Sequence, residues 1–158
     1  MQISSVSIIK KELQHLPQEE LIQLCLRLAK FKKENKELLN FTLFLEKDKD
    51  HFTALVKEDI DEQFMEINRS NFHLIKKSVR KIFRETKKQI RIASDPEVEI
   101  ELLMHLCYKL KTFMPSIQNN FLLTNLFNRT LEQITKKMEK LHEDLQYDFQ
   151  IKLDKLID

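Results

Sequence analysis

Apolar side chains recur at helical spacing along most of this 158-residue chain. Leu, Ile, Val and Phe fill positions three and four residues apart, which share one face of an α-helix. Helix stop and start signals separate these segments, as at Pro17, Pro96 and Pro115. No alternating stretch is long enough to indicate a sheet. The pattern predicts an all-α fold of about seven to eight helices, packed as an irregular array in a single domain, 1–158.

The spacing also predicts where several helices begin and which faces they bury. We expect Pro17 to be the first residue of the second helix, Asn35 to be the N-cap of the third, and Ile117 to lie in the seventh. A helical tail follows, divided near residues 141–142. The second helix has a dense apolar face that we expect to be buried, formed by Leu21, Leu24, Cys25, Leu28 and Phe31.

An internal repeat runs through this pattern. Residues 21–31 and 103–113 both read Leu-x-x-Leu-Cys-x-x-Leu-x-x-Phe, and two shorter matches follow in the same order, 39–44 with 122–127 and 58–64 with 143–149. One interpretation is chance, because amphipathic helices share leucine spacings. The other is a duplication, with repeat units 17–70 and 97–156 joined by residues 71–92. A helical-repeat-like array commonly holds a partner, which favours a protein–protein interaction or scaffold role.

Composition limits the function classes. The chain contains no glycine, so it lacks the glycine-rich loops that bind the phosphates of mononucleotides and dinucleotides. Its apolar runs are too short to cross a bilayer, and its first residues do not have the pattern of a signal peptide. We therefore expect a cytoplasmic protein with no membrane partner. Cys25 and Cys107 lie in apolar helical patterns, which favours buried free thiols over a disulfide.

Residues 71–92 carry the most unusual pattern. On an ideal helix the apolar residues from Phe72 to Ile90 fall within an arc of roughly 100°, and the cations occupy an adjoining arc of roughly 140°. Eight basic residues and one acid, Glu85, give +7, whereas the whole chain is +2. These cations are the candidate polyanion-binding residues and are called the basic face: Lys76, Lys77, Arg80, Lys81, Arg84, Lys87, Lys88 and Arg91.

Two interpretations of the basic face remain open. It could bind the phosphates of a nucleic acid or another polyanion. Alternatively, acids of helices 51–69 and 96–113 could neutralise it. Exposed ion pairs contribute only about 0–1 kcal/mol each, so stability alone explains eight cations on one side poorly. The face has few aromatic side chains for base stacking, because Phe72 and Phe83 lie on the apolar arc.

Other candidate chemistry is weak. Glu12-x-x-His15 and Glu139-x-x-His142 have the spacing used in di-iron helical bundles. The first pair directly precedes Leu16-Pro17, where a buried site is not expected. No cluster has zinc-ligand spacing, and nothing marks a reactive nucleophile. We therefore predict no metal, no cofactor and no catalytic residue, and a protein that is not an enzyme.

Four segments carry a resemblance to known proteins: Asn-Lys-Glu-Leu-Leu (35–39), Lys-Lys-Ser-Val-Arg-Lys-Ile (76–82), Lys-Lys-Gln-Ile-Arg (87–91) and Leu-His-Glu-Asp-Leu-Gln-Tyr-Asp (141–148). Through them the chain resembles a group of small, uncharacterised, all-helical bacterial proteins. The resemblance implies a bacterial cytoplasmic protein. It brings no activity, cofactor, partner or functional residue to this chain.

From the sequence we expect a non-enzymatic interaction module. Another protein, or a second copy of the chain in a homo-oligomer, is the first candidate partner, because of the helical-repeat-like pattern. A nucleic acid or other polyanion bound through the basic face of helix 71–92 is the alternative.

Overall fold

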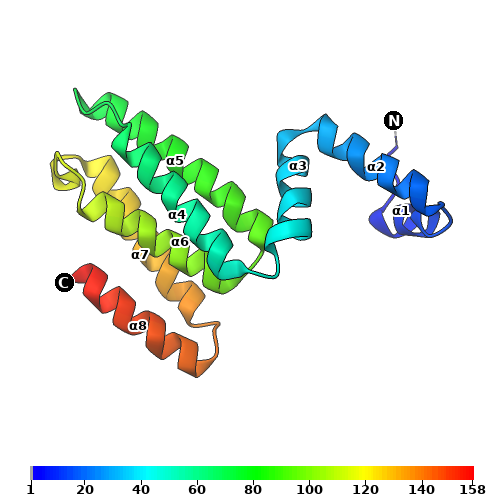
Figure 1. Cartoon of the computed structure of the whole chain (residues 1–158). Helices are drawn as coiled ribbons and strands as arrows, with labels where there is room; N and C mark the ends of the chain where they lie inside the picture. Colours follow the sequence, from blue (N-terminus) through cyan, green and yellow to red (C-terminus); the bar gives the residue numbers. More distant parts are fainter. Residues whose placement is uncertain (1) are drawn as a thin grey trace. The chain divides into compact units, whose positions relative to one another are not determined.

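The computed structural model describes residues 2–158 and is all-α, as predicted (Figure 1). Over these residues the chain forms eight α-helices and no strand. A π-helical turn (Phe41–Leu45) follows the third helix, and a 3₁₀ turn (Ile117–Asn119) precedes the seventh. The helices are α1 (Val6–Leu13), α2 (Gln18–Phe31), α3 (Lys33–Asn40), α4 (Lys49–Met65), α5 (Phe72–Ala93), α6 (Pro96–Lys111), α7 (Phe121–Met138) and α8 (Glu143–Ile157).

The chain divides into two compact units, Met1–Phe44 and Leu45–Asp158. The first unit contains α1 to α3, and the second contains α4 to α8. The boundary falls inside the first predicted repeat unit, 17–70. The single domain and the internal duplication both stay predictions.

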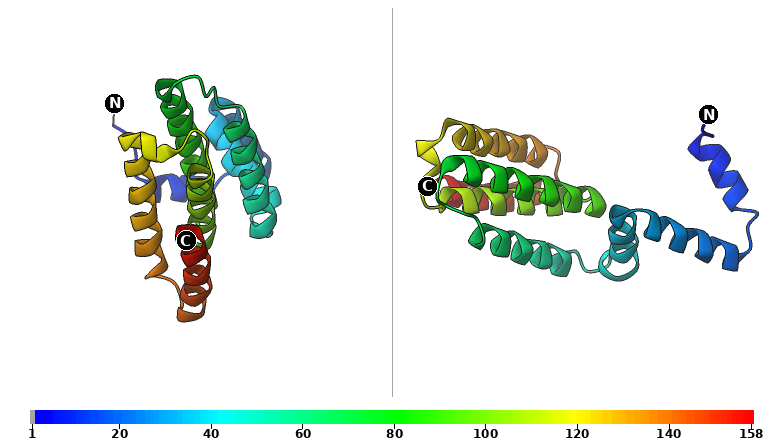
Figure 2. Two further views of the ribbon diagram at one scale, coloured as in Figure 1. Left: turned by 90° about the vertical axis from the view of Figure 1, so that its left-hand side faces the viewer. Right: turned by 90° about the horizontal axis from the view of Figure 1, so that it is seen from above.

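The core of the second unit is organised around α6. This helix packs against α4, α5, α7 and α8. The long helices of the unit run along one another, as two further views show (Figure 2). The apolar residues of α6 therefore lie at the centre of the unit, where their burial contributes most to stability, whereas Glu97, Tyr108 and Lys111 are exposed. Its fully buried side chains include Ile100, Leu102, Leu103, Leu106, Cys107 and Leu110.

Local sequence sets where the helices of the second unit begin. The Asp95 carboxylate accepts hydrogen bonds from the backbone N–H groups of Glu97 (3.0 Å) and Val98 (3.1 Å), and Pro96 is the first residue of α6, as predicted. The turn before it requires a residue with positive φ at the end of α5. Because the chain has no glycine, Ser94 adopts this left-handed conformation, with φ of 49°.

The first unit has almost no core. None of α1, α2 and α3 contains a buried residue, and Phe41 is the one buried side chain among residues 2–44. The predicted burial of the apolar face of α2 is therefore wrong: Leu28 is 51% exposed and Phe31 is 77% exposed. Within this unit α2 packs against α3, and three short helices are too few to enclose the apolar positions of α2.

Several predicted boundaries shift by a few residues. Pro17 precedes α2 as its N-cap residue, and Asn35 lies inside α3, where its side-chain amide donates to the Leu28 carbonyl (2.8 Å). Ile117 lies in the separate 3₁₀ turn, so α7 begins at Phe121. The predicted division of the tail near residue 141 is confirmed, because α7 ends at Met138 and α8 begins at Glu143.

Candidate polyanion interface

The basic face lies on α5. An N-cap fixes where this helix begins, and packing fixes its rotation about its own axis. The helix begins where the Asn71 side chain accepts a hydrogen bond from the Leu74 backbone N–H (3.0 Å). Packing against α4 and α6 buries the apolar stripe. Because the stripe faces inward, the adjoining arc that carries the cations cannot also face the core. The buried residues of the stripe are Ile75, Val79, Ile82, Phe83 and Thr86.

The cations of the basic face are predominantly exposed. Lys76 and Lys88 are half-buried, and the other six side chains are exposed: Lys77, Arg80, Lys81, Arg84, Lys87 and Arg91. Glu85, an acid on the same helix, lies 3.6 Å from Arg84 Nε and 3.4 Å from Lys88 Nζ. The Arg84 side chain still exposes 67% of its surface, so this contact leaves its guanidinium accessible.

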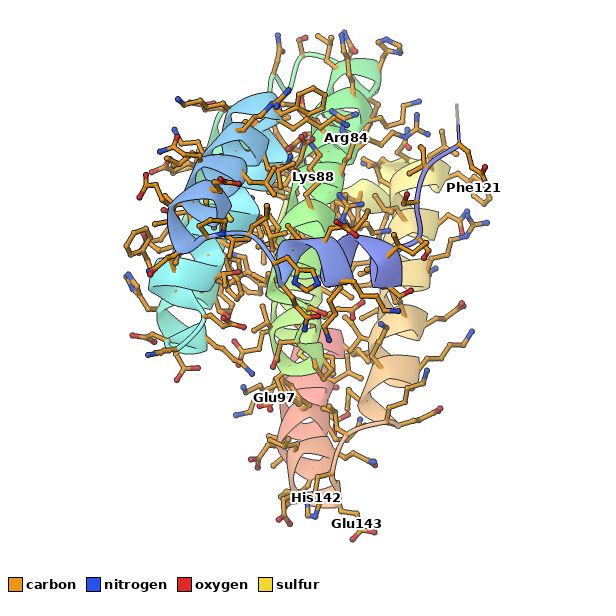
Figure 3. The ribbon with its side chains drawn as sticks, turned by 90° about the vertical axis from the view of Figure 1, so that its right-hand side faces the viewer. Arg84, Lys88, Glu97, Phe121, His142 and Glu143 are labelled. Carbon is orange, nitrogen blue, oxygen red and sulfur yellow. The ribbon has the colours of Figure 1, made fainter. Side chains whose placement is uncertain are left out.

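Two open depressions lie along the basic face. One, of about 330 Å³, is lined by His73 and by Lys76, Lys77, Arg80, Lys81 and Arg84. The other, of about 430 Å³, is lined by Phe83, by Leu126 of α7, and by Arg80, Arg84, Lys87, Lys88 and Arg91. Arg80 and Arg84 belong to both, so the two depressions form one cationic surface along α5. Figure 3 shows Arg84 and Lys88 on successive turns of the helix.

Several of the acids that were predicted to neutralise the basic face have other partners. Asp61 of α4 contacts two cationic or titratable groups of α6, His105 Nε2 at 2.6 Å and Lys109 Nζ at 3.2 Å. Glu101 of α6 contacts Lys57 Nζ of α4 at 2.5 Å. Glu101 also contacts α8 through Lys152, Glu99 pairs with Lys137 of α7, and Asp95 pairs with Lys49 of α4. These acids therefore balance cations of the other helices.

The same contacts shift the pKa values of the acids. Partial burial alone would raise the pKa of Asp61, but the hydrogen bonds and charges of His105 and Lys109 outweigh it and hold the pKa below its usual value. Burial likewise opposes ionisation of Glu101, and its pKa is lowered because Lys57 and Lys152 outweigh that effect. Both carboxylates are therefore ionised at neutral pH and engaged within the second unit.

The second unit is electrically neutral but strongly polarised. Residues 45–158 contain twenty basic and twenty acidic side chains. Residues 71–92 hold eight of these bases and one of these acids, so the remaining residues of the unit carry −7. Any attraction of the second unit to a polyanion must therefore come from the local field of the basic face, because the net charge of this unit supplies none.

Sequence reasoning found the cations but missed the residues of α7 beside them. Leu126 lines the larger depression, although it is distant from α5 in sequence. On an ideal helix Leu122 and Arg129 lie within about 60° of Leu126, and both are exposed. Residues 121–131 contain no acid. The pairing of α5 with α7 across this depression depends on tertiary packing, so local spacing gave no signal for it.

A second cleft of about 370 Å³ lies among α4, α6 and α8. Its polar lining includes Glu101, with which Lys57 and Lys152 both pair, and His105, which pairs with Asp61. The two Glu-x-x-His pairs lie elsewhere: His15 is exposed after α1, and His142 is exposed at the N-cap of α8. No group of three or more metal-ligating side chains is found in residues 2–158.

No protein-family model matches this chain, and neither a curated protein nor a solved structure is significantly similar to it. The resemblance to small helical bacterial proteins gains no support from these comparisons. None of the helices in residues 2–158 combines the length and the apolar composition needed to cross a bilayer.

Proposed function

We propose that this protein is a non-enzymatic interaction module that binds a polyanion through the basic face, with the phosphate backbone of a nucleic acid as the leading ligand class. One observation carries the proposal. Six of the eight cations are exposed along one side of α5, while the ion-paired acids of α4 and α6 contact cations of other helices. Eight aligned cations cost self-repulsion, which a bound polyanion would relieve.

The dimensions of the face suit a phosphate backbone. Lys76 and Arg91 are fifteen positions apart, which spans about 22 Å of helix. One DNA strand places about six phosphates along that length, at 3.4 Å each. Phe83, the aromatic side chain in the larger depression, is buried and cannot stack on a base. We therefore propose that binding is governed by phosphate charge and depends little on base sequence.

The direct test is fluorescence anisotropy with a labelled 20-mer, single- and double-stranded, across a salt series. Each neutralised phosphate of duplex DNA contributes about −0.9 to the log–log slope of affinity against salt. We expect a slope of about −4 or steeper for the duplex. Absence of binding at micromolar protein and physiological salt would reject the proposal for nucleic acids, and heparin in the same assay would test the wider polyanion class.

A matched pair of triple variants assigns the binding to the basic face. In the first, Arg80, Arg84 and Lys87, all exposed, are changed to Gln. In the control, the exposed Lys47, Lys136 and Lys140 are changed to Gln, which removes the same net charge elsewhere in the unit. We expect the first variant to reduce the slope by about 2 to 3, with unchanged helical content, and the control to bind like the parent protein. Equal losses in both variants would refute a localised site.

A protein partner is the second candidate, and a separate observation favours it. Large apolar side chains are exposed along the first unit, including Leu28, Phe31, Leu43 and Phe44. Exposed apolar surface of this extent commonly marks a protein interface. This candidate would act through the first unit and would be insensitive to changes in the basic face.

A further inference from the structure

Helix α2 presents far more apolar surface than one neighbouring helix can cover. On an ideal helix its apolar positions extend from Phe31 through Leu21 to Leu26 over about 220°, whereas a surface helix normally has an apolar stripe of about 100°. No residue of α2 is buried. Exposed side chains lie on both sides of the arc, with Ile22 and Leu26 on one side and Leu28 and Phe31 on the other.

The charges at the two edges of this apolar arc indicate which partner surface would be complementary to α2. Beside Leu26, one edge carries Glu19 near the start of the helix and Lys30 near its end. Beside Phe31, the other edge carries Glu20 and Arg27 in the same order. All four charged side chains are exposed. Each edge therefore runs from acid to base along the helix, and an antiparallel copy of the same helix would place base opposite acid on both edges.

We propose that the chain self-associates through an antiparallel, two-fold symmetric pairing of α2 with α2 of a second copy. In this arrangement Glu19 faces Lys30 of the second copy, and Glu20 faces Arg27. A parallel pairing would instead place like charges side by side. The proposal concerns the first unit and is independent of polyanion binding by the second.

A two-fold symmetric pairing requires the two charged edges and the helix itself to share one centre, and their midpoints agree to within one residue. The midpoint between Glu19 and Lys30 falls between Leu24 and Cys25, and the midpoint between Glu20 and Arg27 falls between Gln23 and Leu24. The midpoint of the helix Gln18–Phe31 also falls between Leu24 and Cys25. One two-fold axis beside Leu24 therefore satisfies both charged edges while the two helices overlap along their full length.

Cys25 supplies a built-in probe of this arrangement. It is exposed, lies within about 10° of the centre of the apolar arc, and is one residue from the proposed axis. Two paired copies would bring their Cys25 side chains within about 3 Å of each other along the helix axis, at a normal interhelical distance of about 8–10 Å. Cys107 is buried, so Cys25 is the accessible thiol of the folded chain.

The first test is crosslinking of the full chain with a short bis-maleimide, which joins two thiols by addition without an oxidant. We expect a covalent dimer from the parent protein and none from Cys25→Ser. A positional control moves the thiol to the polar side of α2 by Gln23→Cys in the Cys25→Ser background. Gln23 is exposed, lies equally near the axis, and points about 170° away from the centre of the arc. Equal crosslinking from positions 23 and 25 would overturn the proposed arrangement.

The second test is sedimentation velocity of the uncrosslinked protein from about 1 to 300 µM, a range suited to a small interface. We expect a monomer–dimer equilibrium. Glu20→Lys should weaken association about tenfold, because two attractive pairs become two repulsive ones, and adding Arg27→Glu should restore it. A monomer at every concentration would overturn the proposal and indicate that α2 is covered by another surface. Failure of the second change to restore association would overturn the antiparallel register.

Discussion

Helices α2 and α6 carry the same apolar pattern but differ in how deeply its residues are buried. Both segments read Leu-x-x-Leu-Cys-x-x-Leu-x-x-Phe, at residues 21–31 and 103–113. In the second segment Leu103, Leu106, Cys107 and Leu110 are fully buried. The corresponding positions of α2 are half-buried or exposed, up to 77% exposure at its final phenylalanine.

The difference comes from the number of neighbouring helices. Four helices of the second unit pack around α6, whereas α2 packs against α3 within the first unit. Phe113, at the end of the second segment, contacts the Phe64 ring edge-on (centroids 6.0 Å apart) and lies under the Arg69 guanidinium. A local pattern therefore specifies that a helix has an apolar side, and the rest of the chain determines what covers it.

The largest expected contrast between the two helices is in the reactivity of their cysteines. Burial raises the pKa of the Cys107 thiol from 9.0 to about 12, which at pH 8 lowers its thiolate fraction about a thousandfold. Reaction also requires the fold around α6 to open. We therefore expect Ellman's reagent to modify Cys25 of dilute folded protein at least about a thousandfold faster than Cys107.

Two variants assign the kinetic phases of that reaction. Cys25→Ser should abolish the fast phase, and Cys107→Ala should abolish the slow phase, while both thiols should react rapidly in guanidinium chloride. Slowing of the fast phase as protein concentration rises would agree with the proposed pairing of α2. Two fast thiols in the folded protein would show that α6 is not buried as described.

Truncation of matched leucines should lower the free energy of unfolding by different amounts in the two helices. This contrast is smaller than the contrast in cysteine reactivity but still large. Leu110 and Leu28 occupy the same position of the shared pattern, with 0% and 51% exposure. Leu110→Ala should reduce the free energy of unfolding by about 2–5 kcal/mol, because it leaves a cavity in the core. Leu28→Ala should cost less than about 1 kcal/mol in dilute protein, because alanine favours helix and no cavity forms.

Urea titration monitored by circular dichroism measures both changes. The midpoint should fall strongly for Leu110→Ala with a similar dependence on denaturant, and it should move little for Leu28→Ala. Comparable losses for the two variants would mean that the apolar side of α2 is buried in dilute solution.

Much of the second unit follows from sequence alone. The apolar arc of residues 72–90 predicted a buried stripe, and Ile75, Val79 and Ile82 are buried as expected. Pro96 marked the start of α6 because its ring restricts φ and its missing N–H is not needed there. These features are determined by residues close in the chain, so a local pattern can report them.

Features that depend on distant residues could not be predicted in this way. The exposure of Cys25 and the burial of Cys107 differ although the two local sequences match. The cations of the basic face were found from the helical spacing, whereas Leu126 beside them was missed because α7 reaches α5 only in the folded unit. The partners of Asp61 and Glu101 were missed for the same reason, since each contacts a helix about forty or more residues away.

The smallest expected effect concerns the ion pairs that connect α6 to its neighbours. The pKa of Glu101 is lowered in the folded state: burial opposes ionisation, but Lys57 and Lys152 outweigh it. An acid with a lowered folded-state pKa stabilises the fold fully above its unfolded pKa, ordinarily 4.5, and loses that contribution as the pH falls through the lower folded value.

Glu101→Gln should therefore cost about 0.5–1 kcal/mol at pH 7, a modest amount because the side chain is partly exposed. The difference between variant and parent should shrink as the pH falls through the folded-state pKa of Glu101, below which both carry a neutral group. Urea titrations at a series of pH values from 7 downward would measure it, and Glu97→Gln, an exposed acid one turn earlier on α6, is the matched control. A cost that stays constant across the whole pH series would show that Glu101 acts through packing and not through its charge.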